Sequence, residues 1–253
     1  MISYFAIYSI VKFRLREFSF EYHYTILAPI INNLLFVLIF STIDKYYSLS
    51  INNISFIEFL IPGLIIMIVA QESYDNSSAS LINSKQIGSF NDFLMAPLSR
   101  VEILVSYILS QIIIGIFLGV INFFILSFFV DFNQISIFLF LYYIILVIIF
   151  FSSLGCIIGF LAFNWDTQSS FSNFFVIPLN FLSGTFFSIN ALPDNLKVIF
   201  LFNPYYYIVN SFRNSFYYDF EFKLFQNIII FIFVFSAFIL AVFVFYKGFR
   251  LIK

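Results

Sequence analysis

The feature that most constrains this chain is a series of long apolar runs separated by short polar segments. A helix needs about 20 mostly apolar residues to cross the hydrocarbon core of a membrane. Of the 253 residues, 62% are hydrophobic and 10% are charged, so little of the chain is left for a soluble domain. The sequence therefore predicts an all-α integral membrane protein in which residues 1–253 form a single membrane domain.

Six of the apolar runs are predicted to be transmembrane helices. The fifth is the shortest, and it contains Pro178. The predicted spans are residues 22–43, 57–76, 103–130, 135–163, 171–187 and 224–246. A short DFNQ turn joins the third span to the fourth, which predicts a helical hairpin.

Residues 1–20 precede the first span and contain an apolar run that is too short to cross a membrane. Ser9, Lys12, Arg16 and Ser19 recur there at the spacing of one helix face. This polar stripe predicts a helix that lies in the membrane interface. The charges follow the apolar run instead of preceding it, which argues against a cleaved signal peptide.

The basic residues predict the orientation. With six spans both termini lie on the same side, and eight Lys or Arg residues fall on that side against four on the other. The eight are Lys12, Arg14, Arg16, Lys85, Arg100, Lys247, Arg250 and Lys253. Because basic residues are enriched on the cytoplasmic side, both termini are expected in the cytoplasm.

The segment QIGSFNDFLMAPLSRVEIL, residues 86–104, separates the second span from the third. Ser89 and Asp92 form an S-x-x-D helix-start signal. One apolar face follows at positions i, i+3, i+4 and i+7, formed by Phe90, Phe93, Leu94 and Pro97. The pattern predicts a short amphipathic helix, which could lie on lipid headgroups, pack on its own bundle, or dock in a groove of another protein.

Several motifs in a fixed order closely resemble the membrane subunit of type-2 ABC exporters, the group that includes drug-efflux and polysaccharide-export permeases. The motifs are EFLIPGL at 58–64, LMAPLS at 94–99, FLSGTFF at 181–187, LP at 192–193 and NPYYYI at 203–208. The resemblance covers almost the whole chain. It implies a permease of the bacterial inner membrane.

The resemblance also implies an assembly. It makes residues 88–100 a coupling helix that contacts a separate cytoplasmic ABC ATPase subunit through Phe90, Asp92, Phe93, Leu94 and Pro97. It implies that two permease copies pair, through the first and fifth spans, and bind two copies of the ATPase, which hold ATP and Mg. It further implies that residues 189–222 form short re-entrant helices on the outer side, in contact with membrane lipid.

The chain itself carries no recognisable catalytic or cofactor motif. None of its eight glycines belongs to a G-x-x-x-x-G-K-[ST] phosphate loop. His23 is the only histidine, and Cys156 is the only cysteine, so neither a metal cluster nor an internal disulfide is expected. The net charge of −1 gives no sign of a nucleic-acid partner. We expect a protein that is not an enzyme and binds no cofactor of its own.

Four polar residues in or near the apolar runs are candidates for the translocation path, namely Asn32, Asn33, Glu72 and Asp75. Ionisable side chains at membrane depth are costly and mark functional sites by default. If the second helix continues through Asn76, Glu72 and Asp75 can line a hydrated path. If it ends there, they are interfacial charges. Asn32 and Asn33 either form interhelical hydrogen bonds or contact substrate.

Two GxxxG motifs permit close approach of helices. Gly115 and Gly119 lie in the third span, and Gly155 and Gly159 lie in the fourth. They are predicted to pack the hairpin within one subunit.

The leading hypothesis is a permease subunit of an ATP-driven exporter that moves an amphipathic, lipid-linked or drug-like substrate. Two other classes stay open, a membrane glycan or acyl transferase and a nonenzymatic membrane scaffold. A co-purifying ATPase distinguishes the exporter from both.

Overall fold

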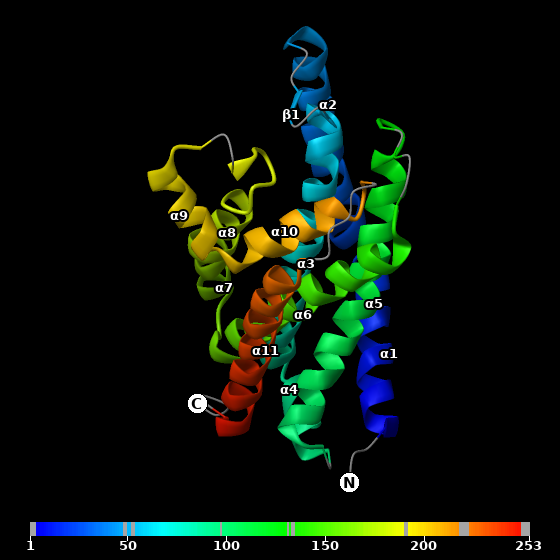
Figure 1. Ribbon diagram of the computed structural model, residues 1–253. Helices are drawn as coiled ribbons and strands as arrows, with labels where there is room; N and C mark the ends of the chain where they lie inside the picture. The colour runs from blue at the N-terminus through cyan, green and yellow to red at the C-terminus, as the bar shows by residue number, and fades with distance from the viewer. Residues whose placement is uncertain are drawn as a thin grey trace.

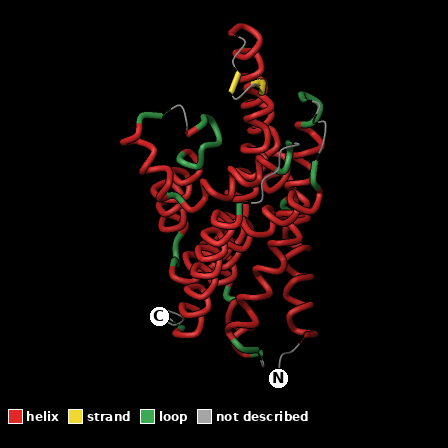
Figure 2. The backbone as a smooth tube through the Cα atoms, in the orientation of Figure 1, coloured by secondary structure: helices red, strands yellow, loops and turns green. Residues whose placement is uncertain are grey.

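The computed structural model describes residues 4–47, 50–51, 54–96, 98–130, 132, 135–189, 192–217 and 223–248. Helices make up nearly all of this part of the chain (Figure 2). Five described helical segments are long and apolar enough to cross a membrane: His23–Tyr46, Phe56–Ile87, Arg100–Leu126, Ile137–Leu161 and Leu224–Lys247. The prediction of an all-α integral membrane protein is confirmed at this level.

The first helix, α1 (Tyr4–Phe20), leads through a short π-helix, η1 (His23–Leu27), into α2 (Ala28–Tyr47). The predicted polar stripe, with Lys12 and Arg16, is exposed. However, α1 is aligned with the long helix α5 and packs against it (Figure 1), instead of lying flat across the bundle. The interfacial placement of residues 1–20 stays a prediction. Arg14 donates to the Asn76 carbonyl oxygen at 3.0 Å, and Glu17 accepts a hydrogen bond of 3.0 Å from Ser80, so α1 is tied to α3.

A two-residue hairpin, β1 (Ser50–Ile51) and β2 (Ile54–Ser55), precedes α3 (Phe56–Ile87). The side chain of Ser55 caps α3 by accepting a hydrogen bond from the amide of Glu58. The helix has 32 residues and extends well past the predicted end at residue 76. At 1.5 Å per residue it is about 48 Å long, which exceeds the roughly 30 Å hydrocarbon core. Its last turns therefore reach beyond the membrane-spanning part.

Three helices follow α3: α4 (Ser89–Met95), α5 (Arg100–Leu126) and α6 (Ile137–Leu161). The helix predicted over 88–100 is shorter than expected. It ends at Met95, and Ala96 and Ser99 are extended before α5 begins. Ser99 forms a full capping box with Glu102. A capping box favours a new helix start, which explains why the segment forms two helices.

The predicted fifth span corresponds to α7 (Trp165–Phe171), a second π-helix η2 (Ser172–Val176) and α8 (Ile177–Phe181). These continuous segments have seven, five and five residues, so the run begins and ends earlier than the predicted 171–187. A turn with Gly184 at φ 75° ends it, a backbone conformation that glycine adopts without strain. Pro178 lies in the first turn of α8, where its missing amide is tolerated.

The chain ends with α9 (Asp194–Phe202), α10 (Pro204–Asn214) and α11 (Leu224–Lys247). Within the predicted re-entrant segment 189–222, the two short helices α9 and α10 are described. Residues 190–191 and 218–222 lie outside the described residues.

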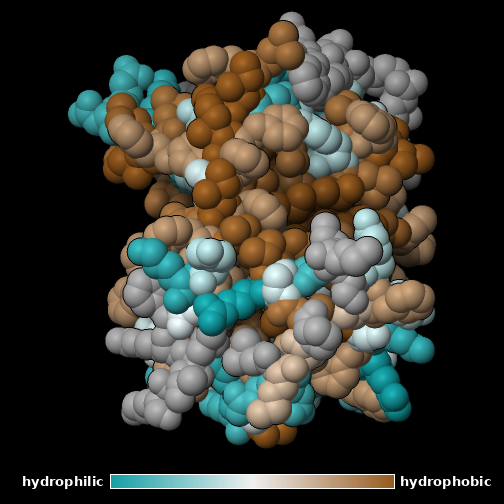
Figure 3. All heavy atoms as spheres, turned by 90° about the horizontal axis from the view of Figure 1, so that it is seen from below, coloured by the Kyte–Doolittle hydropathy of each residue, from teal (hydrophilic) through white to brown (hydrophobic). Residues whose placement is uncertain are grey.

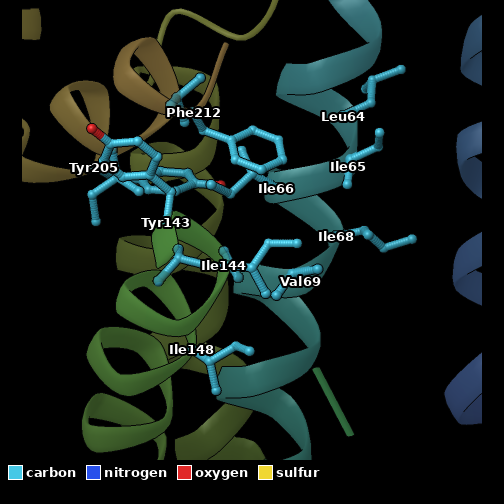
Figure 4. Close-up of a cluster of buried hydrophobic side chains, with 14 of the residues drawn as sticks. Leu64, Ile65, Ile66, Ile68, Val69, Tyr143, Ile144, Ile148, Tyr205 and Phe212 are labelled. Carbon is cyan, nitrogen blue, oxygen red and sulfur yellow. The ribbon is translucent and has the colours of Figure 1, made fainter. Parts of the chain in front are cut away.

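The main core lies between α3, α6 and α10. Figure 4 shows side chains of α3, such as Val69, facing Ile144 and Ile148 of α6 and Tyr205 and Phe212 of α10. All five are fully or almost fully buried. Burying such side chains stabilises a fold by roughly 1.5–3 kcal/mol each in water, whereas in lipid the gain comes mainly from close packing.

Glycines bring the helices of this core close together. A Cβ on Gly155 would lie 2.5 Å from the Tyr74 carbonyl oxygen, and one on Gly159 would lie 2.8 Å from the Ser78 oxygen. These two glycines therefore face α3. Gly115 faces Ile148 of α6, as the predicted hairpin requires. The prediction for the second motif needs correction, because α6 presents its glycines to α3 and not to α5.

A second cluster packs one end of the bundle, where α4 and both chain termini are located (Figure 1). It includes Phe90 of α4, Phe160 of α6 and Phe245 of α11. Figure 3 views this end and shows patches of polar and of hydrophobic side chains on it.

Candidate functional site

A cavity of about 400 Å³ separates α3 from η1, α2 and α8. Its walls are mostly apolar, with a few polar side chains among them. The lining residues are Tyr24, Ala28, Pro29, Asn32, Asn33, Phe36, Leu64, Met67, Ile68, Gln71, Glu72, Ile177, Asn180 and Phe181. Cavities of this size and polarity are typical of small-molecule sites.

Both π-helical segments adjoin this cavity. Tyr24 of η1 lines it, and Ile177 follows η2 directly. Ser172 of η2 accepts a hydrogen bond of 3.0 Å from Gln71 Nε2 of α3. Short π-helical insertions widen a helix locally and occur frequently at functional sites.

Glu72 lies within α3 and lines the cavity. The helix continues through Asn76, and the Nδ2 atom of Asn76 donates a hydrogen bond of 3.1 Å to Glu72 Oε2. This continuation is the condition under which the sequence predicted that Glu72 lines a path. Its role in transport stays a prediction.

Asp75 lies one turn further along α3 but is not part of the cavity lining. Gln71 Nε2 donates to one of its carboxylate oxygens at 2.7 Å, and Gln168 Nε2 of α7 donates to the other at 2.8 Å. Asn180 Nδ2 in turn donates to Gln71 Oε1 at 2.9 Å. Because both carboxylate oxygens are already bonded, Asp75 acts as a polar link between α3 and α7.

The two asparagines of α2 have different surroundings. Asn33 is buried, and its Nδ2 donates to the Leu64 carbonyl oxygen at 3.2 Å and to Asn122 Oδ1 at 3.3 Å. It therefore forms the interhelical hydrogen bonds that the sequence offered as one alternative. Asn32 is exposed and lines the cavity, where a ligand could reach its amide.

A second site is the end of the bundle that carries α4. Gly88 has φ 87°, a left-handed conformation that ends α3 and lets α4 begin at the next residue. Phe90 is 3% exposed and its ring lies 6.3 Å from that of Phe160, edge to face. Phe90 therefore packs on its own bundle and holds α4 in place. It is not available to a partner in this structure.

The other predicted contact residues of α4 are more accessible. Asp92 is exposed, and Phe93 is half-buried with its ring 6.4 Å from that of Phe13 in α1. Met95 is 85% exposed. Pro97 and the side chain of Leu94 lie outside the described residues. A partner would therefore meet the face that carries Asp92 and Met95.

Polar contacts tie this end of α3 to the neighbouring helices. Lys85 Nζ donates to the carbonyl oxygens of Phe160 and Ala162 at the end of α6. Trp165 of α7 donates from Nε1 to Gln86 Oε1 at 3.1 Å. These contacts join the end of α3 beside α4 to α6 and α7.

Comparison with known proteins identifies this architecture. The family model described as "ABC-2 type transporter" matches residues 6–217. The chain belongs to the ABC-2 type transporter family. It is also 29% identical over 192 residues to the inner membrane transport permease YadH of Escherichia coli strain K12, an alignment that covers 76% of this chain and 75% of the relative. The YadH proteins of Escherichia coli O157:H7 and Shigella flexneri match to the same extent. The chain is therefore the permease subunit of a type-2 ABC transporter, as its motifs predicted.

Two groups of residues in this permease were missed by the sequence analysis. One is the set of amides around Asp75, contributed by Gln71, Gln168 and Asn180. The other is Arg213 of α10, which is buried and donates to the carbonyl oxygens of Phe59 and Gly184 at 3.0 and 2.9 Å. The signal that the sequence offered was a polar residue in or beside an apolar segment.

Proposed function

We propose that this permease is the membrane subunit of an ATP-driven exporter. Two copies would enclose a route for an amphipathic, lipid-linked or drug-like substrate. ATP and Mg would be held by two copies of a separate ABC ATPase, since the permease sequence contains no phosphate loop. The relatives are named as inner membrane transport permeases, which favours the bacterial inner membrane.

The observation that carries this proposal is the build of α4. A seven-residue helix follows a left-handed glycine and is fixed to the bundle by Phe90, while Met95 on its other side is 85% exposed. A short helix that is rigidly attached and exposed at one end of the bundle can receive a push from a partner. The hydrogen bonds of Lys85 with α6 would carry that displacement into the membrane.

The path of the chain supports a sixth crossing of the membrane. Residues Trp165–Phe181 return from the end that carries α4 toward the opposite end (Figure 1). With this crossing, both termini lie on the side of α4, where eight of the twelve basic residues are expected from the sequence. We therefore propose that this side is cytoplasmic.

The exposure of α2 supports pairing with a second copy. In the most apolar part of the segment His23–Tyr46, 22% of the residues are buried, whereas 78% are buried in the corresponding part of α3. Large side chains such as Ile39 of α2 and Phe174 of η2 remain exposed. This agrees with a dimer seam through the first and fifth spans, beside the cavity that contains Asn32 and Glu72.

The proposal is tested by co-purification of the permease with its ATPase. We expect Met95→Asp to leave folding intact and to reduce ATPase recovery at least about tenfold, because a charge replaces an apolar contact at an interface. Tyr46→Asp is the matched control. Tyr46 is 86% exposed and lies in the last turn of α2, at the end of the bundle opposite to α4. Equal recovery with both variants would contradict the role of α4.

The outcome also separates the alternative functions. A different protein recovered through α4 would favour the scaffold. Covalent turnover of a glycan or acyl substrate by the permease alone would favour a transferase.

A further inference from the structure

The cavity beside α3 is lined by an acidic side chain and by no basic one among the described residues. Among its described lining residues, Glu72 is the one with a carboxylate, and none is Lys, Arg or His. By contrast, Glu17 of α1 forms an ion pair of 2.6 Å with Arg14. Glu72 has no such cation among the described residues, so the cavity contains a carboxyl group without a positive partner.

The hydrogen bonds of Glu72 leave part of its carboxylate free. Asn76 donates to Oε2, and no described residue donates to Oε1. Asp75 differs, because amide groups of Gln71 and Gln168 occupy both of its carboxylate oxygens. A charged group that leaves water is costly unless it is paired. A ligand that brings a positive charge would therefore be stabilised at Glu72 and not at Asp75.

A second acceptor near the cavity has no partner. Asn180 is 1% exposed and lines the cavity, and its Nδ2 is used by Gln71. Its Oδ1 is buried and accepts no hydrogen bond within the described part of the chain. Unpaired buried acceptors cost about 1–3 kcal/mol. Because Asn180 Oδ1 is buried, the carboxyl group of Glu72 is the acceptor that a cationic donor in the cavity would meet.

The remaining walls fit the apolar body of such a ligand. Tyr24, Phe36 and Phe181 contribute aromatic rings, and Leu64, Met67 and Ile68 contribute aliphatic surface. Aromatic faces attract cations as well as apolar groups. A volume of about 400 Å³ falls in the range of sites for drug-sized molecules.

We propose that this cavity binds an amphipathic organic cation, with the positive group beside Glu72 and the apolar body against Phe36 and Phe181. Binding follows from the cavity alone, while the assignment of this cation as the transported substrate rests on the proposed exporter function.

The test compares two ions of nearly the same shape and opposite charge. Tetraphenylphosphonium and tetraphenylborate are titrated into the purified full-length permease in a nonionic detergent, with binding to empty micelles subtracted. We expect saturable binding of the phosphonium and none of the borate. Glu72→Gln should weaken phosphonium binding at least about tenfold, which corresponds to about 1.4 kcal/mol.

Two further variants separate a lost charge from a disturbed fold. Glu72→Asp retains the charge and should keep most of the binding. Glu21→Gln makes the same chemical change at an exposed residue outside this cavity and should change nothing. Unaltered phosphonium binding by Glu72→Gln, or borate binding as tight as phosphonium binding, would overturn the proposal.

Failure here is distinguishable from failure of the exporter function. Recovery of the ATPase through α4 is measured without any ligand. A permease that recovers its ATPase but ignores both ions would remain a transporter subunit with a different substrate class.

Discussion

The two long sides of α3 are built in opposite ways. On the side of α6, Gly155 and Gly159 bring the two backbones so close that a single added carbon would contact carbonyl oxygens at 2.5 and 2.8 Å. On the side of α2 and α8, the helices leave a cavity of about 400 Å³ that contains Glu72. One helix therefore has a side without free space and a side with room for a ligand.

This difference indicates which parts can move. Closely packed interfaces behave as rigid units, because any displacement creates overlaps or voids. We expect α3 and α6 to move together, and α2 and α8 to move relative to them. The opening and closing of the cavity would then change its volume without disturbing the packed core.

The largest effect is expected from Gly159→Leu on the packed side. The new side chain would overlap the Ser78 backbone, which cannot move without displacing α3. Overpacking costs about 1–3 kcal/mol where side chains can adjust, and more is expected against backbone. The measurement is the yield of monodisperse protein by size-exclusion chromatography, and near wild-type yield would contradict the rigid contact.

Arg213→Met removes the polar anchor that joins α10 to the start of α3 and to the turn after α8, and it should have the next largest effect. The guanidinium of Arg213 donates to the carbonyl oxygens of Phe59 and Gly184. Its central carbon, Cζ, lies 3.7 Å from the centroid of the Phe59 ring. Leaving these oxygens unpaired should destabilise the protein by about 3 kcal/mol. Thermal unfolding in detergent measures the loss. Arg100→Met is the control, because Arg100 is exposed and bonds to Tyr246 alone in the described contacts.

Asn33→Leu tests a residue that lines the cavity and also forms hydrogen bonds between helices. Asn33 links α2 to α3 and α5 through the Leu64 oxygen and Asn122. Hydrogen bonds of this kind between membrane helices contribute about 1 kcal/mol, so a small decrease in the unfolding midpoint is expected. Asn32→Leu, at an exposed neighbouring position, should leave the midpoint unchanged. Equal effects would mean that the interhelical bonds are not the cause.

The smallest effect on stability is expected from Ala28→Leu on the cavity side. Ala28 is exposed and lines the cavity, so the larger side chain has space and should change stability by less than about 0.5 kcal/mol. It should nevertheless weaken tetraphenylphosphonium binding, because it occupies part of the ligand volume. A large loss of stability here would show that this side is packed as tightly as the other.

The hydrophobic pattern by itself determined the class of the protein and the approximate position of its helices. Runs of about 20 apolar residues have few alternatives to membrane-spanning helices, because the backbone must satisfy its own hydrogen bonds in lipid. The motifs around Pro62, Pro97 and Pro204 identified the family, which the comparison with known proteins confirms. The sequence also predicted a short helix after the second span, and α4 is present.

The tertiary structure decided which face of each helix meets which neighbour. Periodicity predicts an apolar face that contains Phe90, but it cannot tell whether the protein's own bundle or a partner covers that face. Glycine spacing predicts close approach, yet it does not say that Gly155 faces α3. Similarly, a lone Glu72 and a lone Asp75 look alike in the sequence. Only the packing of α7 brings the Gln168 amide to Asp75, and only the packing of α2 and α8 leaves Glu72 beside a cavity, because these elements are distant from α3 along the chain.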